Sequence, residues 1–398
     1  MKIFGITLSK DKKTTNVVPS TRVRGKVSNT IKKQYRRDVS WQIKDIRMAE
    51  MLARNPNLPN RRRLFEIYYY VLKDLRLKGQ LRDAIMKVTG EPWMFYDENE
   101  NLQEDLSRQM RKEWMTQIIK WIAYVEFWGY SVLEFDGLKP DTFDIDTITL
   151  LPREHISIEW QQILIMAEVG SSSIDYSDIM WDLDIIEFFD TREDLGMLNE
   201  IAYNTIWKYY SRSDWSRASE KFGMPLLSII ADTNNDNELD RLENKAADFG
   251  TDGYVVAQKG DTVSIIERAG QRIHDIYLDS INLSNNENEL GINGQLATSQ
   301  EKAFVGSAEV QERKFEDLTL TRLEFVKNQI NKNLLPYLRV KGFAIPENFV
   351  FDYPALINDR EQKLNPKQNQ PVSANTDANG IPQPEPEPIN SQNPPSED

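Results

Sequence analysis

The side chains of this sequence that are best suited to chemistry are carboxylates. Asp144 lies two residues before Asp146, and Asp182 lies two residues before Asp184. Such pairs are able to bind magnesium or to act as general acid and base. A chain with 62 aspartates and glutamates produces these spacings by chance. We therefore do not assign a metal nuclease or a glycosidase to these pairs.

A sharper metal-binding pattern spans residues 232–243. Oxygen-bearing side chains occupy positions 1, 3, 5 and 12 of a calcium-binding loop, namely Asp232, Asn234, Asp236 and Glu243. Asn237, however, replaces the glycine that makes the sharp turn at position 6. We favour the simpler interpretation that Asp236 or Asn237 caps a helix over 238–249, with calcium binding as the alternative. We predict no bound metal and no cofactor.

The residues that other kinds of catalysis require are missing from the sequence. The chain has no cysteine, which excludes thiol nucleophiles, disulfides and thiolate zinc sites. Its two histidines, His155 and His274, have no metal-ligand spacing, so we expect both to be structural. The chain has no P-loop, because Gly25-Lys26 lacks the upstream glycine and is followed by valine. We predict that the protein is not an enzyme.

The net charge of −13 argues against general binding to nucleic-acid phosphates. Residues 1–37 are nevertheless strongly basic, and this arm is either a solvated, mobile terminus or a contact for nucleic acid or an acidic partner. No apolar run reaches 18 residues and the N-terminus has no secretory leader, so we expect a protein that is made and used in a cytoplasm.

The elements expected in the first half of the chain are helices followed by short strands. Helical spacing of apolar residues predicts helices over 62–78, 81–88 and 104–128. The last of these ends at Gly129, and the strand YSVLEF follows it. Residues 141–210 alternate strand-like runs with turn residues, which predicts a small antiparallel sheet containing TITLL, HISIEW, ILIMAEV, DIIEFF and TIWKYY.

In the second half, LLSIIA at 226–231 is strand-like, and residues 254–257 and 262–266 flank a turn and predict a hairpin. A helix over 272–283 and then a flexible, polar loop up to residue 299 are expected. A long helix follows Gly306, with its apolar stripe at Phe315, Leu318, Leu323, Val326, Ile330, Leu334 and Leu338 and with Arg322, Lys327 and Lys332 outside it. From about Asn365 the composition is that of a disordered tail.

One segment combines aromatic residues, spaced basic residues and a helix-ending Gly-Met-Pro: WKYYSRSDWSRASEKFGMPLL, from Trp207 to Leu227. It carries no catalytic group, which is typical of an assembly element. It resembles a passage of tailed-phage portal proteins of the Mu-like branch.

Further passages, in the same order along residues 64–345, are similar to that branch. They are carried by Asp74, Leu75, Arg82 and Trp93; by Gly129 to Glu134; by Leu151 to Glu154; by Gly253, Val255, Val256, Gly260 and Glu267; by Glu289 to Gly291 with Gly294 to Thr298; and by Gly306 to Val310. The inserted Ile292-Asn293 departs from the family pattern. The shared order is more specific than any one of these passages.

The resemblance implies an α+β, mostly helical portal fold with a small antiparallel β-rich wing and clip region and long stem and crown helices. The regions it implies are a basic arm (1–40), a wing-like domain (41–228), a stem, clip and tunnel-loop region (229–300), a long C-terminal helix with a crown-like region (301–361) and a disordered tail (362–398).

The implied function is a ring, usually of twelve subunits, at one capsid vertex, through which double-stranded DNA is packaged and ejected without sequence specificity. The implied partners are the terminase large subunit, the major capsid protein and a head–tail adaptor, and no membrane is involved. The implied location is the virion, after assembly in a bacterial cytoplasm. The alternatives are another phage adaptor or scaffold protein, or a carboxylate-dependent metal-binding enzyme.

Two sets of site residues follow from these considerations. The expected tunnel loop supplies candidates for contact with DNA in the channel: Asn285, Asn286, Asn288, Gly291, Asn293 and Gly294. The aromatic and basic segment supplies candidates for the subunit interface: Trp207, Arg212, Trp215, Arg217 and Lys221. For the three basic residues, a solvated helix face is the alternative.

Overall fold

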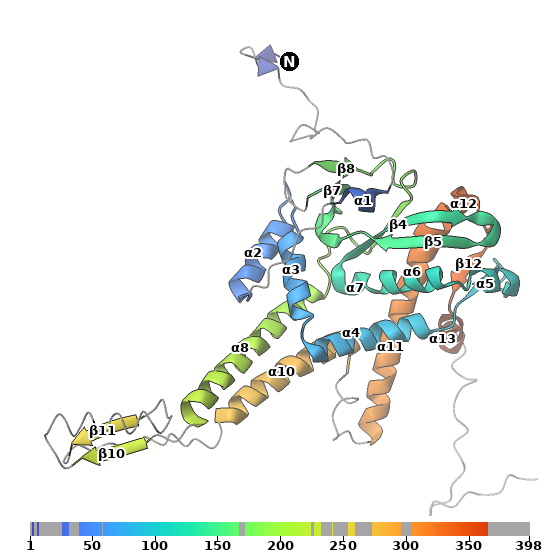
Figure 1. Cartoon of the computed structure of the whole chain (residues 1–398). Helices are drawn as coiled ribbons and strands as arrows, with labels where there is room; N and C mark the ends of the chain where they lie inside the picture. Colours follow the sequence, from blue (N-terminus) through green and yellow to red (C-terminus); the bar gives the residue numbers. More distant parts are fainter. Residues whose placement is uncertain are drawn as a thin grey trace, which may run out of the picture.

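The structure is a computed structural model, and it describes residues 2–3, 6–7, 26–31, 40–57, 59–166, 172–223, 227–231, 241, 254–258, 273–295 and 305–364. Most of the basic arm, the calcium-like pattern apart from Arg241, the turn and second strand of the predicted hairpin, and the tail from residue 365 lie outside these residues. The described elements form an α+β fold in which helices predominate and the sheets are small, as the sequence predicted (Figure 1).

The helices are α1 (Val27–Thr30), α2 (Ile43–Ala53), α3 (Arg62–Val71), α4 (Leu75–Gly90), α5 (Glu104–Met110), α6 (Glu113–Ala123), α7 (Val125–Trp128), α8 (Leu198–Gly223), α10 (Ile273–Asn293), α11 (Val305–Gln329), α12 (Leu335–Val340) and α13 (Pro354–Leu364). Short 3₁₀ turns span Pro140–Thr142 and Arg153–His155, and a π-helical turn spans Ile330–Leu334.

The strands are β1 (Lys2–Ile3), β2 (Ile6–Thr7), β3 (Met94–Tyr96), β4 (Tyr130–Lys139), β5 (Asp144–Leu150), β6 (Ile156–Ser157), β7 (Gln162–Leu164), β8 (Ser173–Asp175), β9 (Ile185–Phe189), β10 (Leu227–Ala231), β11 (Tyr254–Gln258) and β12 (Val350–Asp352). They pair in the orders β1-β2, β5-β4-β9, β6-β7-β8, β12-β3 and β10-β11.

The predicted helix over 62–78 is wrong at its end. α3 ends at Val71, and Asp74 begins α4 as its N-cap, with its carboxylate accepting a hydrogen bond from the Leu77 amide at 3.1 Å. An aspartate N-cap satisfies one of the free amides of the first turn, so it favours a new helix at this point. The end of α4 at Gly90 agrees with the prediction.

The single helix expected over 104–128 is three helices, α5, α6 and α7. Lys112, between α5 and α6, is extended. Ser107 ties α5 to β3, because its hydroxyl accepts a hydrogen bond from the Phe95 amide at 2.9 Å. Trp114 instead ties α6 to the start of β5, donating to the Phe143 carbonyl at 3.2 Å. Contacts to two different strands therefore interrupt a helix whose apolar spacing is continuous.

The antiparallel sheet β5-β4-β9 forms where the sequence predicted strands. β4 follows Gly129, whose φ of 84° ends α7, and pairs Tyr130 with Phe189 and Leu133 with Leu150. The run TIWKYY is an error of the sequence analysis, since residues 205–210 lie inside α8. Thr205, Ile206 and Lys208 are buried on one side of α8, and burial of this helical face outweighs the strand propensity of the run.

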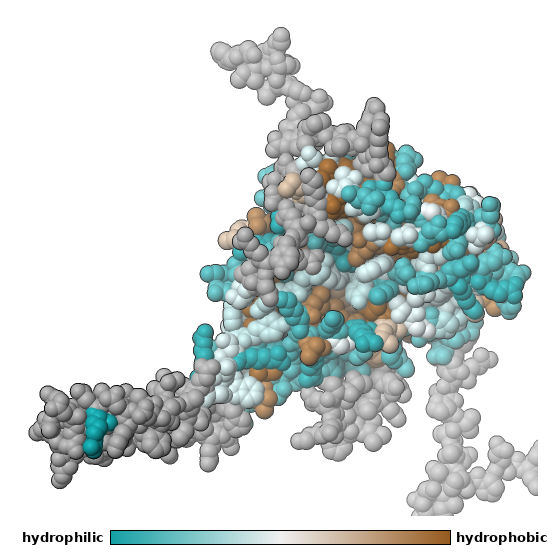
Figure 2. Space-filling view, in the orientation of Figure 1, coloured by the Kyte–Doolittle hydropathy of each residue, from teal (hydrophilic) through white to brown (hydrophobic). Residues whose placement is uncertain are grey.

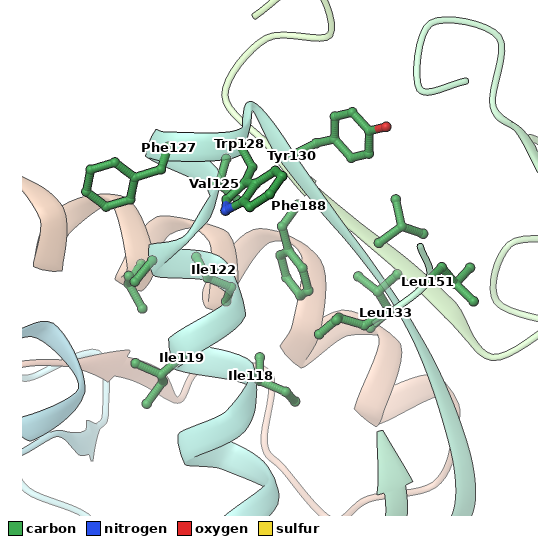
Figure 3. Packing of buried hydrophobic residues seen from close by; sticks show 14 of the residues in the cluster. Ile118, Ile119, Ile122, Val125, Phe127, Trp128, Tyr130, Leu133, Leu151 and Phe188 are labelled. Carbon is green, nitrogen blue, oxygen red and sulfur yellow. The ribbon is translucent and has the colours of Figure 1, made fainter. Parts of the chain in front are cut away.

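One hydrophobic core joins the sheet to helices from both ends of the described chain. Around β4, buried side chains of α6, α7 and β9 pack closely, among them Ile118, Ile122, Trp128, Leu133 and Phe188 (Figure 3). The C-terminal elements belong to the same core, because the stripe predicted after Gly306 is buried at Leu323, Val326, Ile330, Leu334 and Leu338. Arg322, a basic residue outside this apolar stripe, is also buried.

The two long helices α8 and α10 lie side by side, and β10 and β11 lie beyond their ends (Figure 1). β10 pairs in parallel with β11, Leu227 opposite Tyr254 and Ala231 opposite Gln258. The hairpin predicted for residues 254–257 and 262–266 is a different pairing, and its second strand lies outside the described residues. Two strands separated by a connection longer than a hairpin turn are able to pair in parallel.

α10 also corrects the sequence analysis, because it continues to Asn293 where a flexible loop was expected from residue 284. Several of its polar residues are buried rather than solvated. Asn285, Asn288 and Asn293 are buried, and Asn288 donates to the Thr205 hydroxyl of α8 at 3.3 Å. Packing of these amides against the subunit stabilises a helix that their propensity alone disfavours.

Candidate assembly interface

The candidate site is the antiparallel pair formed by α8 and α10. Ser211 hydrogen-bonds Ser280 between the two helices at 2.8 Å, and Thr205 accepts from Asn288. The order of these contacts is reversed along the two helices, so the pair is antiparallel. The small side chains allow the helices to approach closely, and the hydroxyl contacts fix their register.

A buried ion pair attaches α8 to the body of the subunit. The Lys208 ammonium lies 2.6 Å from Oδ2 of Asp74, and both side chains are almost fully buried. Arg212 lies 3.6 Å from the same oxygen. Because Asp74 is also the N-cap of α4, this contact links α8 to the start of α4.

Burial disfavours the charged forms of both partners, but their other contacts oppose this effect to different extents. Burial would raise the pKa of Asp74, yet hydrogen bonds from Lys208 and from the Leu77 amide, with the charges of Lys208 and Arg212, lower it below its usual value. Burial lowers the pKa of Lys208, against the opposing effect of Asp74. Asp74 therefore remains ionised, because it has more partners to offset its desolvation.

A second set of ionic contacts attaches α10. Glu289, which is 3% exposed, accepts hydrogen bonds from Arg76 at 2.8 Å and from Gln80 at 3.3 Å, both on α4. At the end of α10, Arg322 of α11 donates to the Ile292 carbonyl and holds Glu126 of α7 through two bonds of 2.6 and 2.8 Å. The base of the helix pair is thus fixed by charge-assisted bonds to α4 and α11, and through Arg322 to α7.

The five interface candidates from the sequence lie along α8. Trp207 is 57% exposed, Trp215 is half-buried, and Arg217 is exposed with Asp214 at 3.8 Å. Arg212 is half-exposed and points to Asp74. The side chain of Lys221 lies outside the described residues. A role of these residues in a subunit contact remains a prediction.

The six channel candidates are not gathered on a loop. Five lie in α10, and Gly294 directly follows it with a φ of 69°. Asn285, Asn288 and Asn293 are buried within the subunit, whereas Gly291 is exposed. Contact of any of these residues with DNA remains a prediction.

The carboxylate pairs of the sequence have other partners. Asp146 forms an ion pair with Lys139, and Asp184 accepts from the Tyr337 hydroxyl at 2.9 Å and pairs with Lys341. Among the described residues no group of three or more acidic or histidine side chains is placed to hold a metal. His155 is structural as expected, since it is buried with Nδ1 2.8 Å from the Leu164 carbonyl oxygen; the side chain of His274 is not described.

Within the part of the chain that the structure describes, no helix has the length and apolarity needed to cross a membrane. Sequence reasoning did not find Lys208, Glu289 or Arg322 as anchoring residues. No local signal marks them, because each partner is distant in sequence: Arg76 and Glu289, for example, are separated by 213 positions.

Solved structures and one protein family are similar to this chain. The chain resembles a solved HK97-family phage portal protein from Corynebacterium diphtheriae, with 12% identity, 73% of this chain and 96% of that chain covered, and a TM-score of 0.43. It also resembles a chain from the neck of an empty GTA particle, with 13% identity, 77% and 91% coverage, and a TM-score of 0.45. No curated protein matches the sequence. The sequence model of the portal protein of Mu bacteriophage matches residues 65–372, well over half of the chain, and this chain therefore belongs to that family of structural phage connector proteins.

Proposed function

We propose that this protein forms a ring, of twelve subunits as is usual in the family, at one vertex of a phage capsid, and that double-stranded DNA enters and leaves through its centre. The observation that carries the proposal is the α8–α10 pair, a long two-helix element fixed at one end to an α+β body and followed at the other by β10 and β11 (Figure 1). Such an element, repeated around an axis, forms the wall of a channel.

The charge of the chain supports passage of DNA rather than its capture. The net charge is −13, and α10 contains aspartate and glutamate but no lysine or arginine. The part of the wall that α10 forms makes few ionic bonds to phosphates, so a polyanion is able to slide along it without sequence preference. Because three of the six sequence-predicted channel residues are buried, we propose that DNA meets the segment that joins α10 to α11.

We propose that each region of the chain forms one part of the ring. Residues 41–228 act as the wing, apart from α8, which joins residues 229–300 in the stem and clip, and residues 301–361 supply the crown. The ring docks the terminase large subunit during packaging, then a head–tail adaptor, and is held in place by the major capsid protein. Its place is the portal vertex of the virion, after assembly in the bacterial cytoplasm.

Electron microscopy of the purified full chain tests the proposal. We expect top views of rings with a central hole and a particle mass that is a whole multiple of 46.3 kDa. A compact monomer that binds a divalent metal and cleaves a substrate would overturn it, in favour of the carboxylate-dependent enzyme.

A further inference from the structure

The side of α10 that faces away from the subunit carries an apolar stripe. Ile276, Leu283 and Leu290 are 66%, 60% and 52% exposed. Their spacing of seven residues places them on one face of the helix, over about 21 Å at 1.5 Å per residue. The buried residues of α10 lie on the opposite face: Ile281, Ser284, Asn285, Asn288 and Ile292. Figure 2 shows hydrophobic side chains at the surface of the helix pair, among hydrophilic ones.

The charged residues beside the stripe are acidic. Asp279 and Glu287 are exposed on the same side of α10, and the helix has no basic side chain to offset them other than His274. Two copies of α10 that met face to face would bring these like charges together, which is unfavourable. The stripe therefore requires a different surface as its partner.

The outward face of α8 has the complementary character. Trp207, Tyr210, Asp214 and Arg217 follow one another at helical spacing. The Trp207 ring contacts that of Tyr210 edge to face, at 6.1 Å between centroids, and leaves more than half of its surface exposed. The Arg217 side chain is 79% exposed. Tryptophan and arginine are the residue types most enriched at the energetic centre of protein interfaces.

We infer that the apolar stripe of α10 docks against the outward face of α8 in a second copy of this chain, with Trp207 of one copy on Leu283 of the next. The inference rests on the proposed ring and assigns its stem contact. Within a subunit Thr205 lies level with Asn288 and Ser211 with Ser280, so Trp207 lies near the level of Leu283. When neighbouring copies are related by rotation about an axis parallel to the helix pair, Trp207 of one copy stays at the height of Leu283 of the next.

The two faces belong to one helix pair, so each copy contacts one neighbour through α8 and the other neighbour through α10. Such a contact is head-to-tail, and its repetition closes into a ring when the rotation allows. The acidic edge of α10 then meets the arginine of α8 rather than another acidic edge.

Because the chain has no cysteine, disulfide cross-linking tests this contact directly. Trp207→Cys and Leu283→Cys are made as separate variants of the full chain, co-expressed, purified and oxidised. We expect disulfide-linked dimers from the mixture and none from either variant alone. A mixture of Trp207→Cys with Val340→Cys, a 66% exposed position on α12, is the matched control and should not cross-link.

Two outcomes would overturn the contact. Dimers from Leu283→Cys alone would show that α10 meets its own copy. A mixed cross-link that is absent from the full chain and forms only after deletion of residues 1–25 would assign the stripe to the basic arm. As an independent measurement, Leu283→Glu should raise the concentration for half-maximal assembly at least about tenfold without changing the melting temperature, because Leu283 is exposed.

The same samples separate this inference from the ring itself. Wild-type rings without the mixed cross-link would refute the contact and leave the proposed function standing. A wild-type protein that remains monomeric at micromolar concentration would refute both.

Discussion

Asp74 and Lys208 form an ion pair of 2.6 Å in which both side chains are almost completely withdrawn from water. The pair joins the first turn of α4 to the middle of α8. It thus fixes the direction in which the helix pair leaves the body of the subunit. Its energetic importance lies in what remains when one partner is removed, because a lone buried charge is costly.

Removal of either partner should destabilise the subunit. We expect Lys208→Met to lower the free energy of unfolding by about 3 kcal/mol, and Asp74→Asn, which keeps an N-cap residue, to have a similar cost. The double variant should lose less than the sum of the two. Urea unfolding measures all three. Arg108→Ala, which removes an exposed pair with Asp105, is the control and should change nothing measurable. Additive losses would show that the two charges do not interact.

The ion pair should also make the free energy of unfolding depend on pH in the acidic range. The pKa of Asp74 is lowered in the folded protein, so its contribution is complete above the unfolded pKa, near 4, and is lost as the pH falls through the lower folded value. The difference in unfolding free energy between wild type and Asp74→Asn should therefore be constant from pH 7 to about 5 and shrink below 4. A difference that grows on acidification would contradict this sign.

Gly129 and Gly196 lie where no other residue fits. Gly129 has a φ of 84°, and a Cβ there would lie 2.5 Å from the Asp194 carbonyl oxygen; a Cβ on Gly196 would lie 2.4 Å from the Gly129 nitrogen. Gly129→Ala should cost about 3 kcal/mol in thermal or urea unfolding, from the strained backbone and the clash together. Gly79→Ala in α4, where nothing lies within 4 Å, should instead stabilise by about 0.5 kcal/mol. Equal effects of the two would refute this distinction.

Trp215 should matter for assembly more than for folding. Its side chain is half-buried on the part of α8 that extends away from the body. We expect Trp215→Ala to reduce the fraction of protein in rings, measured by mass photometry, at temperatures at which circular dichroism shows the subunit still folded. Trp160→Ala, at a partly exposed tryptophan next to β6, is the control and should keep its rings. Intact rings from Trp215→Ala would count against this role.

The sequence was most informative where local chemistry determines the structure. Gly129 ends a helix and starts β4 because it tolerates a positive φ, and α8 ends at Gly223, before Pro225, as Gly-Met-Pro predicted. The apolar stripe of the C-terminal helices was found because its spacing reflects one buried face.

Tertiary contacts decided what the sequence left undetermined. The asparagine-rich part of α10 has the composition of a loop, and it is helical because its amides are buried against α8 and the body. The run at 205–210 has strand propensity and is helical for a similar reason. At the candidate site, the tryptophans and arginines of α8 were predicted from composition, and their role in assembly stays a prediction. Lys208 and Glu289 were not, since their partners lie far away along the chain.

In the ring that we propose, the α8–α10 pair lines the channel. The most direct test is a cryo-electron microscopy reconstruction of the purified full chain. We expect a closed ring whose central hole is surrounded by α8 and α10, with α8 of each subunit against α10 of the next. A monomeric particle, or a ring whose hole is lined by the β5-β4-β9 sheet while α8 and α10 point outward, would contradict it.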